Sequence, residues 1–501
     1  MGLSAAEYRL MLPILELTIF ALGILLIDLL IPREWKWLNA VAALMGVGFA
    51  AVSVAQIQRA LPNGGLGFLN SLLVDRIAIY FWYLFLAGTA IAILMSVRYL
   101  EIEDENHGEY YVLMLMAVAG MMCMAAGIDL VLIFIGLELM AISTYVLVGF
   151  LRRDRRSNEA ALKYLLLGAF SSGIFAYGLS LFYGLTGTTN LLLIQRALLR
   201  MNPHEPLLLV ALLTTMVGLL FKIAAIPFHQ WAPDAYEGAP TSITAFMSVA
   251  VKAAAWAMLL RVLRFGLFPL RPVYTPIIVF AAVATMTGGN FAALTQSNSK
   301  RLLAYSSIAH VGYMLLALVA MGTSQPGDPA FVDGLKGVLV YLLVYTFMNL
   351  GAFAVITSLR RRDVIGDEID DLSGLYFRAP AEALMMLLFL LSLAGIPPAA
   401  GFLGKYYIFL SLVESGHYVL ACAAVFYVLL GLYYYLKLAN AIFMRPAVIT
   451  ERVQCGAGLR TALAVTALAT LVIGIYPEPF LRGVNWSLGI AQSSHVSALM
   501  R

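Results

Sequence analysis

The chain alternates long apolar runs with short polar connections over most of its length. Runs of about 20 apolar residues, the length that a helix needs to cross the hydrocarbon of a bilayer, can be placed fourteen times. They lie at 10–31, 39–58, 75–97, 110–127, 129–150, 161–184, 207–227, 240–262, 272–294, 302–321, 335–358, 381–413, 417–443 and 461–481. We therefore predict an all-α polytopic membrane protein with about 14 transmembrane helices.

Two of the runs are interrupted by prolines, and each interruption lies beside a lysine. In the first, Lys222 precedes a polar stretch with several prolines, and in the second, Pro397 and Pro398 come shortly before Lys405. A broken membrane helix leaves backbone groups unpaired, which is tolerated only where they line protein or water. We therefore predict two broken helices in the core of an ion path.

The two broken helices lie five helices apart, which predicts an internal repeat. Helices 4–8 would recur as helices 9–13, and a repeat of an odd number of helices must be inverted. The lysine pairs Lys163 with Lys336 and Lys252 with Lys437 fit the same register. The predicted domains are an N-terminal three-helix segment at 1–109, the first repeat at 110–262, the second inverted repeat at 263–443, and a C-terminal helix and tail at 444–501.

Lysines, but not arginines, lie inside the apolar runs. We assign every arginine to a position outside the membrane core, whereas six lysines remain within the runs: Lys163, Lys222, Lys252, Lys336, Lys405 and Lys437. A lysine deep in a bilayer helix costs about 2.5–3.5 kcal/mol on insertion scales, and a desolvated lysine can lose its proton whereas arginine stays charged. This partition indicates groups that change charge. Alternatively, lysines near helix ends extend to the interface, an interpretation that suits Lys163, Lys336 and Lys437 best.

Glu138 is the one acid near the middle of a predicted helix. A lone buried carboxylate would take up a proton, whereas one that faces a lysine can stay ionised and hold that lysine charged. We therefore hypothesise that Glu138 pairs with Lys222. The alternative is a neutral Glu138 whose hydrogen bonds come from hydroxyls of neighbouring turns, such as Ser143 or Thr144.

Composition agrees with the membrane assignment and excludes several kinds of site. The chain of 501 residues is 62% hydrophobic and 12% charged, with a mean hydropathy of +0.88. The net charge of +4 is small and its basic residues are spread out, so nucleic-acid binding is not indicated. Three isolated cysteines, Cys123, Cys422 and Cys455, lack metal-type spacing, and only His310 lies inside an apolar run. We expect no metal, iron–sulfur cluster or haem in this chain.

Lysine and arginine in the short loops predict the orientation. They are more numerous on one set of alternate loops, which we therefore place inside: Arg33, Lys36, Arg98, Arg152, Arg153, Arg155, Arg156, Lys300, Arg301, Arg360, Arg361, Arg362, Arg378, Arg445, Arg452 and Arg460. Both termini would then lie outside, although Arg261, Arg264 and Arg271 cluster on the opposite side. The outer side holds Arg9, Arg59, Arg76, Arg196, Arg200, Arg261, Arg264, Arg271, Arg482 and Arg501. The run 10–31 lacks a signal-peptide cleavage site and should remain as the first helix.

Three segments resemble a known family. They are FHQWAPDAYEGAPTSITAFMSVAVKAA from residue 228, KRLLAYSSIAHVGYMLLAL from residue 300 and GIPPAAGFLGK from residue 395. Together they are similar to the subunit N family of bacterial type I NADH–quinone oxidoreductase, respiratory complex I. This family is part of a wider proton-conducting antiporter-like group that includes subunits L and M and the multisubunit Na+/H+ antiporters. The resemblance covers most of the chain from helix 4 onward, and the N-terminal helices match least.

The resemblance implies roles for seven residues. Glu138 matches the helix-five glutamate, Lys222 and Lys405 the two broken-helix lysines, and Lys252 the central lysine. Lys163 matches a helix-six lysine thought to tune the glutamate–lysine pair. His310 occupies a polar position of helix ten and His229 flanks the first break; either could relay protons, although a structural histidine is an equally good interpretation.

The resemblance also implies a function. The chain would be a proton-translocating subunit of an H+-translocating NADH:quinone oxidoreductase in the bacterial inner membrane, driven by electron transfer in other subunits. FMN, iron–sulfur clusters and quinone would bind partner subunits, since this chain has no nucleotide loop or flavin fingerprint. Expected partners are the other antiporter-like subunits, small helical subunits and lipid. The alternatives are a subunit of a Na+/H+ antiporter or membrane-bound hydrogenase complex, a small-solute secondary transporter, and a non-transporting structural subunit.

Overall fold

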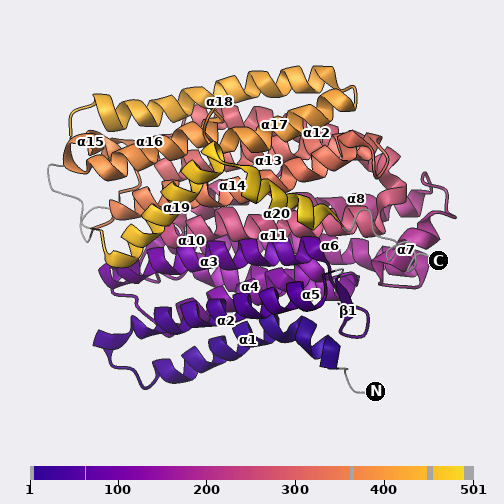
Figure 1. Cartoon of the computed structure of the whole chain (residues 1–501), viewed down its shortest axis with the longest axis horizontal. Coiled ribbons are helices and arrows are strands. Elements are labelled where there is room, and N and C mark those ends of the chain that lie inside the picture. Colours follow the sequence, from indigo (N-terminus) through magenta and orange to yellow (C-terminus); the bar gives the residue numbers. More distant parts are fainter. Residues whose placement is uncertain (1–4, 63, 362–365, 448–454, 490–501) are drawn as a thin grey trace.

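Long helices lie side by side in a single bundle (Figure 1). The computed structural model describes residues 5–62, 64–361, 366–447 and 455–489. Within these residues, twelve helical segments are long and apolar enough to cross a membrane, and two further spans are each built from a broken pair of shorter helices. The described chain therefore contains the fourteen spans that the hydropathy pattern predicts, two of them broken.

The helices follow one another with short connections. Three N-terminal spans precede the repeats: α1 (Ala5–Asp28), α2 (Leu38–Ala60) and α3 (Arg76–Glu103), with a small hairpin of β1 (Gly65–Gly67) and β2 (Leu72–Val74) before α3. The first repeat contains α4 (Gly108–Ala126), α5 (Leu130–Val148), α6 (Arg155–Thr186), the short α7 (Leu191–Leu198), the broken pair α8 (Pro206–Lys222) and α9 (Trp231–Gly238), and a composite span of α10 (Thr241–Phe246), a π-helical turn (Met247–Val251), α11 (Lys252–Arg261) and a second π-helical turn (Val262–Gly266).

The second half begins at α12. It contains α12 (Arg271–Leu294), α13 (Ser299–Thr323), α14 (Pro329–Ser358), the short α15 (Leu375–Arg378), the broken pair α16 (Pro380–Ala394) and α17 (Gly401–Glu414), and α18 (Tyr418–Met444). The chain then adds α19 (Ala457–Ile475) and α20 (Glu478–Leu488). Short 3₁₀ turns occur at Arg33–Trp35, Phe268–Leu270 and Ile369–Leu372.

The same contact between a helix start and a loop occurs once in each half of the chain. Asp129 caps the start of α5 and forms a β-bridge with Asn190, and Asn298 caps the start of α13 and forms a β-bridge with Glu368. The backbone N–H of Leu130, the first residue of α5, donates to the Thr189 carbonyl at 2.9 Å. In the second half, the backbone N–H of Ser299, the first residue of α13, donates to the Asp367 carbonyl at 2.7 Å. Because five spans separate the two junctions, they lie at opposite ends of the bundle, as an inverted repeat requires. The domain boundaries stay a prediction.

Burial separates a central group of helices from the edges. The best apolar window of the composite span Thr241–Gly266 is 100% buried, and those of α13 and α14 are 94% and 89% buried. The corresponding values are 28% for α1 and 22% for α18, which lie at opposite edges of the bundle (Figure 1). Polar side chains on the central helices are therefore enclosed by protein rather than by lipid.

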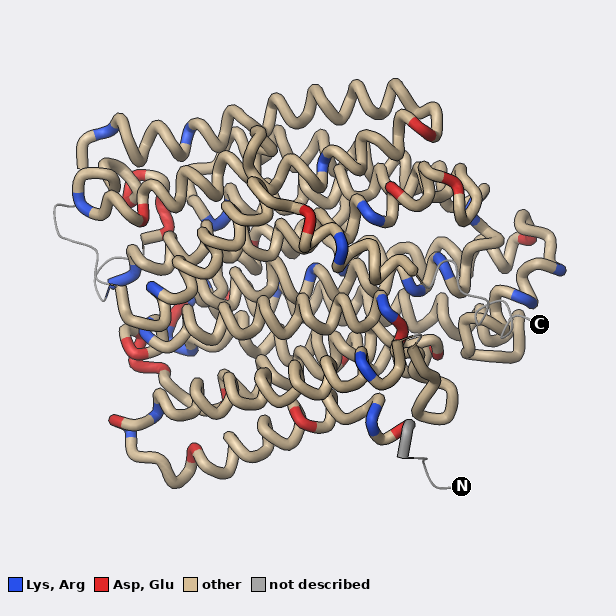
Figure 2. The backbone as a smooth tube through the Cα atoms, viewed as in Figure 1, with Lys and Arg blue, Asp and Glu red and all other residues tan. Residues whose placement is uncertain are grey.

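Charged residues gather at the two ends of the bundle, with few between (Figure 2). One arginine, Arg261, is enclosed by protein in the last turn of α11, near the end of its span. Its guanidinium binds both carboxylate oxygens of Asp75, at 2.8 and 2.9 Å, and donates to the Ala125 carbonyl. A bidentate partner and a backbone acceptor make this burial tolerable. Arg362, Arg452 and Arg501 lie outside the described residues.

Candidate functional site

The first break begins directly after Lys222, the last residue of α8. Ala224 has a φ of +59°, which α-helical backbone cannot continue, and Pro227 follows. The indole of Trp231, at the start of α9, donates to the Phe221 carbonyl at 2.9 Å, and the Ile226 N–H donates to the Thr285 hydroxyl at 3.0 Å. Protein groups therefore take up backbone hydrogen bonds that the break leaves open, as membrane burial demands.

The second break is capped by a lysine. Lys405, buried near the start of α17, donates to the carbonyl oxygens of Leu393 and Ala394 at 3.0 and 2.7 Å. These carbonyls end α16, where the helix dipole favours a positive charge. Gly395, with a φ of +81°, makes the turn, and a Cβ atom there would lie 2.9 Å from Lys405 Nζ. The structure therefore holds the Lys405 ammonium at the carboxyl end of the broken helix.

Lys222 lies beside Glu138 without a direct ion pair in the described structure. Its Nζ is 3.4 Å from the Tyr145 hydroxyl and 5.8 Å from the centre of that ring, and it interacts electrostatically with Glu138. The Glu138 Oε1 atom is buried and has no hydrogen-bond partner. The Ser143 and Thr144 hydroxyls donate to backbone carbonyls of their own helix instead. The hypothesised partners Glu138 and Lys222 thus interact electrostatically but form no direct ion pair in the described structure.

Two buried hydroxyl groups of α6 lie at the same depth as Lys222. A Cβ at Gly178 of α6 would lie 2.5 Å from Thr215 Oγ1 of α8, and one at Gly218 would lie 2.5 Å from Phe175 Cβ. Since the two helices are antiparallel, this register puts Ser171 and Ser172 at the level of Lys222. Both serine hydroxyls are buried and lack a protein partner. Such groups are usually satisfied by ordered water.

Lys252 lies at the centre of the bundle, directly after the π-helical turn Met247–Val251. Its Nζ donates to the carbonyl oxygen of Ser307 at 3.0 Å and contacts the Ser307 hydroxyl, and the Tyr345 ring centre is 5.9 Å away. Isolated π-helical turns are frequent at functional sites. The described structure gives Lys252 no acidic partner, so its nearest acceptors are neutral.

Helix α13 links Lys252 to Lys405. Ser307, His310 and Tyr313 follow one another at intervals of three residues and therefore share one face. His310 contacts the Tyr341 hydroxyl through Nδ1 and the Tyr435 hydroxyl through Nε2, the latter at 2.9 Å. Tyr313 places its ring 5.5 Å from Lys405 Nζ. The predicted residues thus form a buried row from Lys222 through Lys252 and His310 to Lys405.

Two predicted residues lie apart from this row. Lys163 is half exposed and forms ion pairs with Glu159 at 2.9 Å and Asp234 at 3.1 Å rather than with Glu138. His229 lies in the linker between α8 and α9, and its Nδ1 atom is buried without a partner. Of the remaining lysines, Lys437 donates to the Leu294 and Gln296 carbonyls at the end of α12, and Lys336 stacks on the Tyr407 ring.

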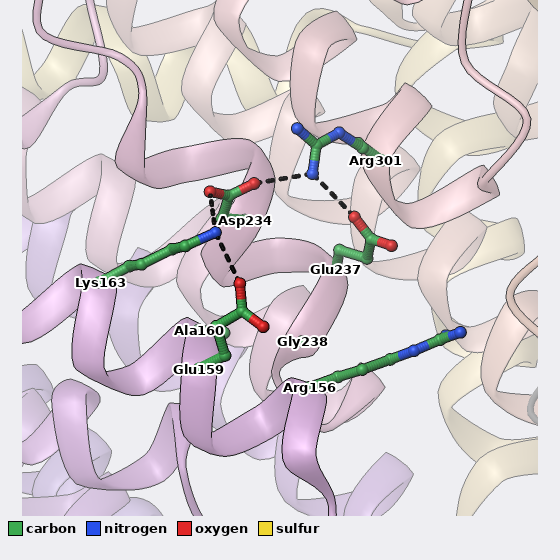
Figure 3. Close-up of a pocket in the computed structure, with 8 residues that line it drawn as sticks. All are labelled: Arg156, Glu159, Ala160, Lys163, Asp234, Glu237, Gly238 and Arg301. Carbon is green, nitrogen blue, oxygen red and sulfur yellow. Dashed lines mark hydrogen bonds and ion pairs between the residues drawn. The ribbon is translucent and has the colours of Figure 1, made fainter.

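A charged pocket, which the sequence did not predict, lies where α6, α9 and α13 meet (Figure 3). The cavity is about 190 Å³ and is lined by Arg156, Glu159, Ala160, Lys163, Asp234, Glu237, Gly238 and Arg301. The Arg301 guanidinium bridges Asp234 at 2.7 Å and Glu237 at 2.8 Å. The spacing of Asp234 and Glu237, one helical turn apart just after a break, is the signal that could have revealed it.

The buried Lys300 connects the segment between α9 and α10 with the loop after α14. Lys300 donates to the Ala239 carbonyl at 2.7 Å, between α9 and α10, and lies 3.6 Å from Asp367 in the loop after α14. Burial raises the pKa of the Asp367 carboxyl above its ordinary value, although the positive charges of Lys300 and Arg360 lower it. This contact ties the second repeat to the break in the first.

Comparison with known proteins gives consistent results. The family described as NADH:quinone oxidoreductase/Mrp antiporter, TM, matches residues 126–431. The chain is 64% identical over 509 residues to NADH-quinone oxidoreductase subunit N 1 of Koribacter versatilis, covering 100% of this chain and 99% of the relative. It is 50% identical over 493 residues to subunit N 2 of Solibacter usitatus, covering 97% and 98% of the two chains.

Solved structures with the same fold include a chain of respiratory complex I from Thermus thermophilus with bound aureothin. It has a TM-score of 0.78 and 32% identity, and the match covers 94% of this chain and 98% of that one. A chain of an archaeal membrane-bound sulfane sulfur reductase has a TM-score of 0.84 and 24% identity over 99% of both chains. At that identity the second likeness concerns the fold alone.

Proposed function

This chain belongs to the NADH:quinone oxidoreductase/Mrp antiporter family of membrane proteins, and on that premise we propose that it is the proton-translocating subunit N of a type I NADH–quinone oxidoreductase. The observation that carries the proposal is the buried row of Lys222, Lys252, His310 and Lys405 across the centre of the bundle. Redox chemistry, with FMN, iron–sulfur clusters and quinone, would take place in partner subunits.

The row suits proton transfer because its members differ in how they are held. Lys252 has neutral acceptors, so loss of its proton leaves no unpaired buried charge. Lys405 is fixed by two carbonyls at a helix end, which favour its charged form. His310, with hydroxyl partners on both ring nitrogens, can take a proton on one side and release one on the other.

The energy required is within reach of such groups. Moving one proton against about 150 mV takes roughly 3.5 kcal/mol, which corresponds to about 2.5 pKa units. Burial and neighbouring charges can shift a lysine by about 3–5 units. Closure of the open Glu138–Lys222 pair would redistribute charge next to Lys252, and the resulting titrations belong to the network rather than to one residue.

We place the end of the bundle with residues 152–156 and the charged pocket inside the cell. Both termini would then lie on the outer face of a bacterial inner membrane, as the distribution of basic residues indicates. Protons would reach Lys252 from the inner face and leave near Lys405 toward the outer face.

The test is NADH-driven proton uptake by inverted membrane vesicles that contain the assembled complex, with and without Na+. We expect uptake to be independent of Na+ and to fall in Lys405→Ala, while the complex still assembles. Loss of uptake on Na+ removal would instead favour a sodium-coupled subunit of the same family. Undiminished uptake in Lys405→Ala would contradict an exit through this lysine.

A further inference from the structure

Helix α9 stands between the charged pocket and the central lysine. On one side its Asp234 and Glu237 side chains line the pocket (Figure 3). On the other, Tyr236 is buried and its hydroxyl interacts with the Ser307 side chain of α13. Ser307 in turn contacts Lys252. A single turn of α9 therefore lies between a charged cavity and the residues that touch Lys252.

Ser307 offers Lys252 two chemically different groups. Its carbonyl oxygen, 3.0 Å from Lys252 Nζ, can only accept a hydrogen bond, which both the ammonium and the neutral amine can donate. Its hydroxyl can accept from the ammonium or donate to the neutral amine. One residue can thus position Lys252 in both protonation states and exchange a proton with it.

The repeat gives independent support for a special role of Ser307. Glu138 lies nine residues after Asp129, which caps α5, and Ser307 lies nine residues after Asn298, which caps α13. Ser307 is therefore the counterpart of Glu138 in the second half. The carboxylate of Glu138 interacts with Lys222 of its own half, whereas the hydroxyl of Ser307 contacts Lys252, which the other half contributes.

We propose that Tyr236 and Ser307 form the relay that delivers protons from the charged pocket to Lys252. The inference deepens the function proposed above and rests on it. When Lys252 is neutral, the Ser307 hydroxyl gives its proton to Nζ and takes one from the Tyr236 hydroxyl. Tyr236 takes its replacement from water that enters through the pocket. Each hydroxyl ends with one proton, Lys252 gains one, and the water at the inner face loses one.

The polar atoms around Lys252 fit this path. The Trp256 indole N–H is buried and has no protein partner in the described structure, and the buried Tyr345 hydroxyl interacts with the Ser307 side chain. Tyr345 places its ring near Lys252, and Trp256 lies one helical turn further along α11. Buried polar groups of this kind usually bind ordered water, so water can reach this side of Lys252.

The test uses inverted vesicles with the complete complex and measures the initial rate of NADH-driven proton uptake across a pH series. We expect Ser307→Ala and Tyr236→Phe to lower the rate about tenfold or more, within the range for loss of a proton-transfer group. Ser307→Thr, which keeps a hydroxyl, should retain most of the rate. The matched controls Ser411→Ala and Tyr111→Phe remove buried hydroxyls elsewhere and should pump like the unmodified protein.

The outcomes separate this relay from the proposed function. Wild-type rates in both Ser307→Ala and Tyr236→Phe, with a loss in Lys252→Ala, would overturn the relay and leave the function standing. Wild-type rates in all three would overturn both. If Ser307→Ala prevents assembly, Tyr236→Phe decides, because it keeps the ring that fills the space between α9 and α13. A rate in Ser307→Thr as low as in Ser307→Ala would also contradict the relay.

Discussion

At the scale of single residues, three buried lysines of one chain are held in three different ways. Lys222 has a tyrosine hydroxyl, Lys252 has a serine carbonyl and hydroxyl, and Lys405 has two carbonyls at a helix end. The number and orientation of these acceptors decide how strongly each site prefers the ammonium form. Lys252 is best suited to change its charge, because the Ser307 hydroxyl can either accept a hydrogen bond from its ammonium or donate one to its neutral amine.

Gly395 allows a test of how Lys405 is held. Gly395→Ala would place a Cβ 2.9 Å from Lys405 Nζ and force alanine into a φ of +81°. We expect a backbone cost of about 1–2 kcal/mol together with displacement of the ammonium and reduced proton pumping. The matched control is Gly416→Ala, at a φ of +78° with no heavy atom within 4 Å, which has the same backbone cost alone.

Thermal unfolding and vesicle pumping together would measure the difference. Equal destabilisation of both variants with pumping lost only in Gly395→Ala is the expected result. Equal pumping in both would mean that the position of Lys405 does not matter for transport.

The residues of the site were predictable from the sequence, but their partners were not. An acid or lysine inside an apolar run is conspicuous because its burial is costly, so Glu138, Lys222, Lys252 and Lys405 could be singled out. Tyr145 and Ser307 are ordinary residues of apolar helices, and only tertiary packing brings them to the lysines. The ion pair between Arg261 and Asp75 was not predictable for the same reason, because the two residues lie far apart in the sequence.

At the scale of elements, the broken and π-helical segments place polar groups in the middle of the bundle. The break after α8 presents Lys222 at the end of a helix, and the π-helical turn Met247–Val251 ends at Lys252. Proline clusters predicted both breaks. The π-helical turns have no sequence signal of this kind, because they depend on packing between α10, α11 and α14.

Coupling between α5 and α8 can be tested at Glu138. Glu138→Gln keeps the size of the side chain but removes the charge that interacts with Lys222. We expect an assembled complex with at least severalfold slower proton pumping, because Lys222 would lose its electrostatic partner. Glu16→Gln is the control, since Glu16 lies on the peripheral α1 and accepts a hydrogen bond from Ser53. Normal pumping by Glu138→Gln would contradict the coupling.

At the scale of the whole molecule, fourteen spans form two inverted halves with additional helices at both ends. Hydropathy alone located every span, because membrane helices must be long and apolar. The inverted relation followed from two proline breaks an odd number of helices apart. The charged pocket was not predicted, since it is assembled from three helices of both halves.

The proposed orientation makes a direct prediction about labelling. In a variant with Cys123, Cys422 and Cys455 replaced by serine, a single cysteine at Gly187 should react with an impermeant maleimide added outside intact cells. A cysteine at Arg153 should react only after the cells are opened, because its loop would face inside. The reverse pattern would invert the topology and the direction of the proposed proton path.

The most direct test of the central claim is proton pumping by assembled complexes with Lys252→Ala and Lys252→Arg, measured beside NADH–quinone electron transfer. Arginine preserves the charge but cannot release its proton, so both variants should lose pumping and coupled electron transfer. Lys437→Ala, which removes a lysine that caps α12, should pump normally. If both Lys252 variants pump like the unmodified protein, protons do not pass through this lysine; if only Lys252→Arg pumps, its charge matters but its titration does not.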